Sequence, residues 1–357
     1  MTPSQDDSGG RWIGVVTVVV TLIGWCSVPL FLRHFAGQVD AWTSNGWRYG
    51  FAALLWMPVV LMGLAKKNLP AGIWKAALVP SAFNIAGQVC FTAAHYQIDP
   101  GLLTFGLRLQ IVFVTIGAVL LFPAERVIAS SKVFLAGMAL VFGGTIVTVA
   151  LDDDFGAQST TFGVLLAVAS GLLFACYGLS VRKYMHKAPA VTAFAVICQY
   201  TAAAMIVLML LFGQRMGADA LAMETDQFLW LLVSALIGIA FGHVFYYISI
   251  ARLGVTVSSG VIQLQPFGVA IGSLLIFGER LSSLQWAGGV TAVVGAGVIL
   301  WVQHKISSRK NGVPAPEEPP MVPYFEPMGR PDEEDEPATE PPEGDGPESG
   351  DERHEAF

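Results

Sequence analysis

The chain has 357 residues, of which 54% are hydrophobic and only 13% are charged. Soluble domains carry about a quarter charged residues, so this composition excludes an ordinary soluble domain and indicates a membrane protein. The formal net charge of -7 comes from the C-terminal end, because residues 311–357 hold fifteen acidic residues and two arginines, whereas residues 1–310 are net basic.

Ten apolar runs of about 20 residues follow one another along the chain, and each is long enough to cross a hydrocarbon core as a helix. Asp40 and Asp99 precede the second and fourth runs as candidate N-caps, and Pro100 follows at the first helical position. The first run lacks a clear cleavage site, so we interpret it as a helix and not as a signal peptide. The sequence therefore predicts an all-α polytopic membrane protein with ten transmembrane helices, at 12–32, 42–64, 73–95, 100–122, 132–151, 162–182, 190–212, 227–250, 254–277 and 284–303.

Basic residues in the predicted loops indicate the orientation of the chain. With a cytoplasmic N-terminus, thirteen lysines and arginines fall on the cytoplasmic side, whereas only Arg33, Arg215 and Arg280 fall on the other. Cytoplasmic loops of membrane proteins carry the excess of Lys and Arg. We therefore expect a multi-pass protein of the cell (plasma or inner) membrane with both termini in the cytoplasm.

The second half of the chain repeats the first. Each copy has five predicted helices, an odd number, so the second copy enters the membrane from the opposite side. Such inverted repeats are typical of secondary transporters, whose substrate site lies near the midplane between the copies. The recurring pairs keep offsets of 149 to 155 residues and include Arg33 with Arg182, "FPAER" (122–126) with "IFGER" (276–280), Gly137 with Gly288, and Gly144 with Gly295.

These features divide the chain into four parts. Residues 1–11 form a cytoplasmic N-terminal segment, 12–151 the first repeat, 162–303 the second repeat, and 304–357 a cytoplasmic tail. Residues 311–357 contain eleven prolines and almost no apolar periodicity. Such a composition cannot bury enough apolar surface to fold, so we expect the acidic tail to be disordered.

Parts of the chain resemble the drug/metabolite transporter superfamily with two EamA-type repeats. The resemblance is carried by "FACYGLSVRKY" (174–184) and "LQPFGVAIGSLLIFGERLSSLQWAGGVTAVVGAGVIL" (264–300), and in the first repeat by "NGWRYGFAALL" (45–55). It implies a ten-helix permease in which the first four helices of each repeat line a central cavity. The fifth and tenth helices are then peripheral and can support a homodimer. The family's substrates include amino acids, other metabolites, sugar conjugates and drugs.

Two arginines interrupt the apolar runs at a similar depth. At a rise of 1.5 Å per residue, Arg108 lies about 12–14 Å below Asp99 and Arg48 about 12 Å below Asp40. An arginine that faces lipid costs at least about 3 kcal/mol, so we expect Arg108 to face the cavity and bind an anion, with Arg48 assisting. Either side chain can instead extend along its helix toward the membrane interface.

Further candidate residues lie on other predicted helices or at the corresponding positions of the second repeat. Helical spacing places Asn84 and Gln88 on one polar stripe, and the repeat offset makes Gln263 the counterpart of Arg108 and Gln199 that of Arg48. Trp25 and Tyr177 are candidate wall residues. His243 and His95 are candidates for proton coupling, although either can be a packing histidine, and we place His95 near the surface.

No pattern in the sequence points to a metal or a catalytic centre. The four cysteines lie inside apolar runs and are interpreted as packing residues. The acidic triplet at 152–154 stands in a predicted loop without a second acidic motif. Glu125 and Glu279 each precede an arginine and are interpreted as helix-end pairs. We therefore expect no cofactor, no metal site and no enzymatic activity.

Taken together, these features predict a secondary transporter that moves a small, anionic or zwitterionic metabolite, such as an amino acid or an organic acid, by alternating access. Its expected partners are that substrate and the lipid bilayer, and not nucleic acid. Two alternatives stay open. One is a transporter of a lipid-linked or drug-like substrate, and the other is a non-transporting membrane sensor or scaffold.

Overall fold

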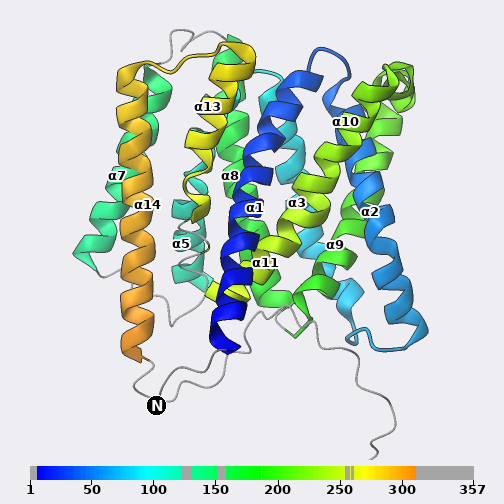
Figure 1. The fold of residues 1–357 in the computed structure, drawn as a ribbon, viewed down its shortest axis with the longest axis horizontal. Helices are drawn as coiled ribbons and strands as arrows, with labels where there is room; N and C mark the ends of the chain where they lie inside the picture. Colours follow the sequence, from blue (N-terminus) through cyan, green and yellow to red (C-terminus); the bar gives the residue numbers. More distant parts are fainter. Residues whose placement is uncertain are drawn as a thin grey trace, which may run out of the picture. The chain divides into compact units, whose positions relative to one another are not determined.

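The computed structural model describes residues 6–121, 131–151, 158–185, 187–253, 258 and 261–310. Within these residues every regular element is a helix (Figure 1). Eight helices are long and apolar enough to cross a membrane, and two shorter apolar helices cover Lys132–Thr148 and Gln265–Phe277. The prediction of an all-helical polytopic membrane protein is thus confirmed, whereas the count of ten spans stays a prediction.

Among the described residues, the first half of the chain forms six α-helices, and the second half forms six more together with a 3-10 helix and a π-helix. The first six are α1 (Asp6–Phe35), α2 (Ala41–Ala65), α3 (Ile73–His95), α4 (Pro100–Leu107), α5 (Gln110–Leu121) and α7 (Lys132–Ala150). The second six are α8 (Gln158–Tyr184), α9 (Ala190–Phe212), α10 (Thr225–Ala235), α11 (Gly242–Leu253), α13 (Gln265–Phe277) and α14 (Ser283–Lys310). A 3-10 helix, η2 (Gln214–Ala222), follows α9, and a π-helix, η3 (Leu236–Phe241), joins α10 to α11.

Helix ends confirm one predicted cap and correct another. Asp40 caps α2, because its carboxylate accepts hydrogen bonds from the backbone N–H groups of Trp42 and Thr43 at 2.9 and 3.0 Å. Asp99 precedes Pro100 as expected but makes no capping bond to α4. Its carboxylate binds Arg33 instead, at 3.2 Å. Asp99 therefore takes the predicted N-cap position, but its side chain does not cap the helix.

Some predicted boundaries shift, and some predictions concern residues outside the described ranges. Helix α14 continues to Lys310, past residue 304, where the tail was predicted to begin. Helix α1 begins at Asp6, inside the segment that was expected to precede the first span. The predicted tail (311–357), the acidic loop (152–154) and Glu125 lie outside the residues that the structure describes.

The fourth predicted span is interrupted at its middle. Helix α4 ends at Leu107 and α5 begins at Gln110, and the backbone N–H groups of Arg108 and Leu109 bond to carbonyls only three residues earlier. A second turn, at residues 263–264, precedes α13. The two turns are 155 residues apart, within the offsets of the sequence repeat. The prediction of one continuous helix over 100–122 is therefore wrong.

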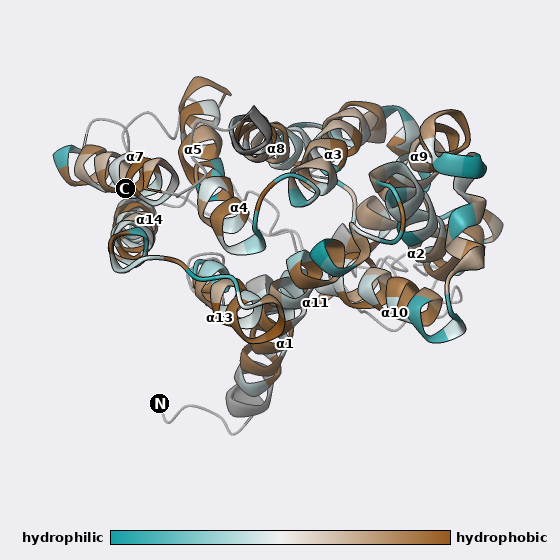
Figure 2. Cartoon of the chain, turned by 90° about the horizontal axis from the view of Figure 1, so that it is seen from above, coloured by the Kyte–Doolittle hydropathy of each residue, from teal (hydrophilic) through white to brown (hydrophobic). Residues whose placement is uncertain are grey.

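Corresponding helices of the two halves pack reciprocally. Helix α1 packs against α11 and α13, while α8, its counterpart, packs against α3 and against α4 and α5, as Figure 2 shows from above. Helices α2 and α9, also counterparts, pack against each other. Each half therefore contributes its first helix to the packing of the other half.

Glycines permit a close contact between α7 and α14. A Cβ added at Gly137 would lie 3.0 Å from the carbonyl oxygen of Gly295, and one added at Gly288 would lie 2.8 Å from that of Gly144. Because residue numbers rise along α7 while they fall along α14, the two helices are antiparallel. Gly137 and Gly288 are counterparts in the sequence repeat, and so are Gly144 and Gly295. The two contacts are therefore related to each other by the symmetry of the repeat.

Two further glycine pairs hold α1 in place. Gly238 and Gly242 lie against Val28 and Trp25, whereas Gly268 and Gly272 lie against Cys26 and Leu30. Four-residue glycine spacing lets helices approach closely in a membrane. These glycines therefore have a packing role, and α1 lies between the two pairs.

Candidate functional site

Arg108 lies at the interruption between α4 and α5, and its side chain is 7% exposed. Its Nε donates to the carbonyl oxygen of Thr104 at 3.3 Å. Its Nη1 donates to the carbonyl oxygen of Ile262 at 3.4 Å and to Gln263 Oε1 at 3.3 Å. Its Nη2 donates to Gln265 Oε1 at 2.9 Å. The guanidinium of one half thus binds the turn that precedes α13 in the other half.

The partners of Arg108 are all neutral. Gln263 was a predicted site residue, whereas Gln265 was missed, and its own amide donates to the carbonyl oxygen of Trp25 at 2.8 Å. Gln88, another predicted site residue, makes no hydrogen bond to Arg108 in the described part of the chain. In the sequence, Gln265 stands next to Pro266 in the "LQP" run, and nothing there indicates a contact with Arg108. Only the structure shows that contact.

Arg48 lies on α2 and is only 2% exposed, so it does not extend to the protein surface. Its Nε donates to Ser234 Oγ of α10 at 3.0 Å. Among the described residues this is its one hydrogen bond, and none of their carboxylates pairs with it. Gln199, its counterpart, instead donates to the carbonyl oxygen of Ala53 at 2.9 Å.

His95 is fully buried at the end of α3, so its predicted place near the surface is wrong. Its Nδ1 lies 2.8 Å from the carbonyl oxygen of Phe91. The other ring nitrogen, Nε2, is buried without a hydrogen-bond partner in the described part of the molecule. One turn earlier, Thr92 Oγ1 donates to Asn45 Oδ1 of α2 at 2.8 Å, which fixes α3 against α2.

His243 lies in an aromatic cluster and not beside either arginine. Its ring stacks on Phe194 at a centroid distance of 4.9 Å and meets the edge of Trp25 at 5.5 Å. Trp25 also contacts Tyr246, with centroids 5.2 Å apart. The structure therefore brings together the predicted site residues Trp25 of α1 and His243 of α11.

The π-helix beside this cluster is bound by two tryptophans. Trp25 Nε1 donates to the carbonyl oxygen of Gly238 at 3.3 Å, and Trp56 Nε1 donates to that of Ala240 at 3.2 Å. π-helical turns inside membrane helices are often found at functional sites. Trp25 belongs to α1 and Trp56 to α2, so both helices bind the same π-helical segment.

The other predicted site residues have structural partners. Asn84 Nδ2 donates to Thr201 Oγ1 of α9 at 3.0 Å, so it links α3 to α9. Tyr177 packs against a buried cluster that includes Val196 and Ile197 of α9. These two residues therefore lie beside α9, whereas Arg108 contacts the turn before α13.

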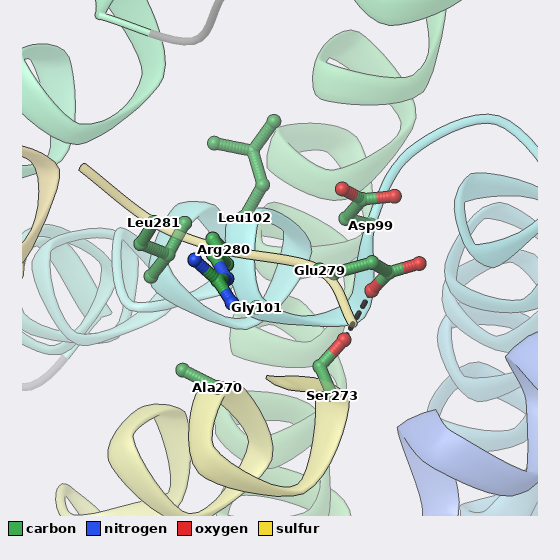
Figure 3. Close-up of a pocket in the computed structure, with 8 residues that line it drawn as sticks. All are labelled: Asp99, Gly101, Leu102, Ala270, Ser273, Glu279, Arg280 and Leu281. Carbon is green, nitrogen blue, oxygen red and sulfur yellow. Dashed lines mark hydrogen bonds between the residues drawn. The ribbon is translucent and has the colours of Figure 1, made fainter. Parts of the chain in front are cut away.

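A separate charged cluster joins three helix ends. Arg33 in the last turn of α1 pairs with Asp99 before α4 at 3.2 Å and with Glu279 after α13 at 3.0 Å. Glu279 also accepts a hydrogen bond from Ser273, at a small pocket that Arg280 and Leu102 help to line (Figure 3). The predicted helix-end pair of Glu279 with Arg280 is thus corrected, because the ion pair of Glu279 is with Arg33.

Comparisons with known proteins place the chain in a family. The profile of the EamA-like transporter family matches it twice, at residues 12–150 and 161–301. Twenty-six chains of solved structures match, including one described as "Crystal structure of protein" with a TM-score of 0.55 and 16% identity, over 84% of this chain and 99% of that one. At this identity the likeness shows the fold alone. No curated protein matches the sequence.

Proposed function

Because the chain belongs to the EamA-like transporter family of the drug/metabolite transporter superfamily, we propose that it is a permease for a small anionic or zwitterionic metabolite, such as an amino acid or an organic acid. Membership of the family makes the chain a membrane transporter. The sign of the substrate's charge follows from the candidate site.

The observation that carries this proposal is a pair of buried arginines without a carboxylate partner. Arg108 is bound by two glutamine side chains and two carbonyl oxygens, and Arg48 by one serine. At the helix ends the situation differs, since Arg33 has both Asp99 and Glu279. The two buried positive charges are therefore not neutralised by any carboxylate of the described residues.

A buried charge of this kind attracts an anion. Amides and carbonyls offset part of the cost of removing a guanidinium from water, but they leave its net charge in place. An anionic group about 4 Å from a guanidinium gains roughly 4 kcal/mol at an effective dielectric constant of about 20. A carboxylate or phosphate would gain this energy here, whereas a cation would be repelled.

The reciprocal packing supports transport by alternating access. Helices α7 and α14 are antiparallel, and Gly101 of α4 lies beside Ala270 of α13 while Arg108 contacts residues 262–265. Corresponding helices therefore run in opposite directions, as inverted repeats require. In the proposed transport cycle each half bends at its central turn, at residues 108–109 in the first half and 263–264 in the second. The same proposal includes ten membrane spans, cytoplasmic termini and a homodimer that forms through α7 and α14.

A counterflow screen of the full-length protein in proteoliposomes tests the charge of the substrate. Vesicles would be loaded with matched anionic, zwitterionic and cationic metabolites. Uptake of a labelled metabolite that is driven by anions or zwitterions supports the proposal. Counterflow with cations alone would overturn it.

Deleting residues 311–357 separates a transporter from a scaffold. A permease keeps counterflow without this segment, because the described residues that form the candidate site end at Gln265. A variant without the segment that inserts and folds but loses counterflow would give the tail an essential role. A full-length protein without counterflow for any metabolite class would favour the sensor or scaffold.

A further inference from the structure

Gln265 is the nearest hydrogen-bond partner of Arg108 among the described residues. Its Oε1 accepts from Arg108 Nη2 at 2.9 Å, whereas the other acceptors of Arg108 lie at 3.3–3.4 Å. Both residues are only 7% exposed. A buried arginine is ordinarily paired with a carboxylate, which its planar fork matches. At the closest position to Arg108 the chain therefore has a neutral amide, where an acidic side chain would neutralise the charge.

The carbonyl group of Trp25 explains why this position requires an amide. Gln265 Nε2 donates to the carbonyl oxygen of Trp25 at 2.8 Å. A carbonyl oxygen can only accept a hydrogen bond and a guanidinium can only donate, and the amide satisfies both because it has an oxygen and an NH₂ group. An ionised glutamate in its place would turn one oxygen toward the Trp25 oxygen, with no hydrogen between them. The Trp25 carbonyl therefore disfavours a carboxylate beside Arg108.

Helix α1 also fixes the backbone of Gln265. Cys26 Sγ donates to the carbonyl oxygen of Gln265 at 3.6 Å, and a Cβ added at Gly268 would lie 2.5 Å from the same sulfur. Trp25 and Cys26 are adjacent in α1, so one turn of this helix holds both the side chain and the main chain of Gln265. The amide is thus kept beside Arg108 by contacts that add no charge.

We infer that Gln265 determines the sign of the substrate's charge. This inference rests on the proposed function, in which Arg108 binds an anion. Gln265 orients the guanidinium through its amide oxygen but, because it is neutral, leaves the positive charge available to the substrate. A carboxylate at this position would form an ion pair with Arg108 and compete with an anionic substrate for the same donors. Gln265 is a positioning residue for Arg108, and its neutrality sets the specificity of the site.

Pairs of a carboxylate and its carboxamide measure this selection by charge. Suitable pairs are lactate with lactamide, succinate with succinamide, and 3-phenylpropionate with 3-phenylpropionamide. Binding is measured on the purified full-length protein by ligand-induced thermal shift, and transport by competition in counterflow. In the unaltered protein the carboxylate of the pair that fits the site should bind at least about tenfold more tightly than its amide, because only the carboxylate forms an ion pair with Arg108.

Two substitutions of Gln265 separate its neutrality from its hydrogen bonds. Gln265→Glu keeps the length of the side chain but places a negative charge against Arg108. The carboxylate should then lose its advantage, so that both members of the pair bind with similar affinity. Gln265→Leu removes both hydrogen bonds but adds no charge, so it should weaken both members and leave the ratio of their affinities unchanged.

Gln285→Glu is the matched control. Gln285 is also a buried amide, since it accepts from the backbone N–H of Ser282 at 2.7 Å and donates to the carbonyl oxygen of Thr148 at 3.3 Å. It joins α14 to α7 and makes none of the hydrogen bonds that Arg108 forms with described residues. A carboxylate at this position should lower the unfolding temperature but keep the ratio within the pair.

An unchanged ratio in a folded Gln265→Glu variant would overturn the inference. Equal affinities in Gln265→Leu would do the same, even if Gln265→Glu cannot be purified folded, because the bonds of the amide and not its neutrality would then set the preference. In both cases the unaltered protein still prefers carboxylates, so the proposed function stands. If the unaltered protein binds no carboxylate, or binds each amide equally well, the proposed function fails together with the inference.

Discussion

Arg108 donates from Nη1 to the side-chain oxygen of Gln263 at 3.3 Å, and these two residues are counterparts in the sequence repeat. A residue that contacts its own counterpart lies close to the axis that relates the two copies. Both copies have a turn at this contact, at residues 108–109 and 263–264. The asymmetry of the pair, arginine against glutamine, therefore places one net positive charge near the axis.

Substitutions of Arg108 separate its charge from its hydrogen bonds. Arg108→Gln removes both, and we expect the affinity for the anionic substrate to fall by about 10- to 100-fold, the value of about 1.5–3 kcal/mol for a bond to a charged group. Arg108→Lys keeps the charge but has only three donors without a planar fork. It should therefore restore only part of the affinity.

Both variants of Arg108 should lose roughly 1–3 kcal/mol of stability, because buried acceptors such as Ile262 O and Gln265 Oε1 lose their donor. Thermal unfolding and substrate titration of the purified protein measure the two effects. Wild-type affinity in Arg108→Gln would limit Arg108 to a structural role at the turns.

Arg33 should restrain the helix ends that it joins. Arg33→Gln breaks the ion pairs to Asp99 and Glu279, which hold α1 to the start of α4 and the end of α13. Partly exposed ion pairs contribute only about 0.2–1 kcal/mol each, so the fold should survive. Leu102, which is buried at the nearby pocket, should then become more accessible.

The measurement is the rate at which a membrane-impermeant maleimide labels Leu102→Cys in a protein without its four native cysteines. Arg215→Gln is the matched control, because the pair of Arg215 with Asp219 spans only four residues of η2. We expect faster labelling in the Arg33 variant alone. Equal rates in the two variants would show that these ion pairs do not restrain the helix ends.

The contact between α7 and α14 should tolerate no side chain at Gly144. A Cβ there would meet Gly288 O and lie 2.5 Å from Ala292 N, both of them backbone atoms. Gly144→Ala should therefore cost about 1–3 kcal/mol, the usual range for overpacking. The adjacent Gly143 is the control, since a Cβ there meets nothing within 4 Å.

Gly143→Ala should be neutral or stabilising by up to about 1 kcal/mol, because alanine is the better helix former. Thermal unfolding of both variants in the same detergent compares them directly. A Gly144→Ala protein as stable as Gly143→Ala would mean that α7 and α14 are further apart than the structure shows.

Asp40 should make stability depend on pH in the acid range. Burial raises the pKa of its carboxyl, but hydrogen bonds from the Thr43 hydroxyl and from the backbone N–H groups of Thr43, Gln214 and Trp42 outweigh burial and hold the pKa below its usual value. A lowered pKa in the folded state means that the carboxylate stabilises the fold above the unfolded pKa of about 3.9. This contribution disappears as the pH falls through the folded pKa.

Asp40→Asn should therefore be less stable than the wild type by about 0.3–1 kcal/mol near neutral pH, the value of a negative charge at a helix N-terminus, and the difference should shrink below about pH 4. Unfolding midpoints across this range provide the measurement. Glu224→Gln is the control, because Glu224 precedes α10 without a side-chain capping bond. A difference between wild type and Asp40→Asn that is constant with pH would contradict the assignment.

Features that depend on local chemistry were predictable from the sequence. Hydropathy located the helices, and Asp40 was recognisable as a cap. The resemblance to EamA-type repeats is confirmed by the family match over both halves. Arg48 and Arg108 could be singled out because charges inside apolar runs are rare.

Features that depend on contacts between distant parts of the chain were not predictable. No proline in the sequence marks the break at residues 108–109. Arg108 at this break donates hydrogen bonds to Ile262, Gln263 and Gln265 of the other half, and these contacts are visible only in the structure. Asp99 looks like a cap by position, but Arg33, 66 residues away, binds its carboxylate. The burial of His95 likewise depends on the packing of neighbouring helices.

Helix α1 packs between helices of the second half, so these native contacts can form only after the second half has been synthesised. Its Trp25 binds the carbonyl of Gly238, 213 residues further along the chain. Ribosomes add about 5–20 residues per second, so α1 waits roughly 10–40 s in the membrane before this partner is made. During that interval the glycine-lined surfaces that receive α1 do not yet exist. The first half is thus an obligatory assembly intermediate, and its native packing is completed by the nascent second half.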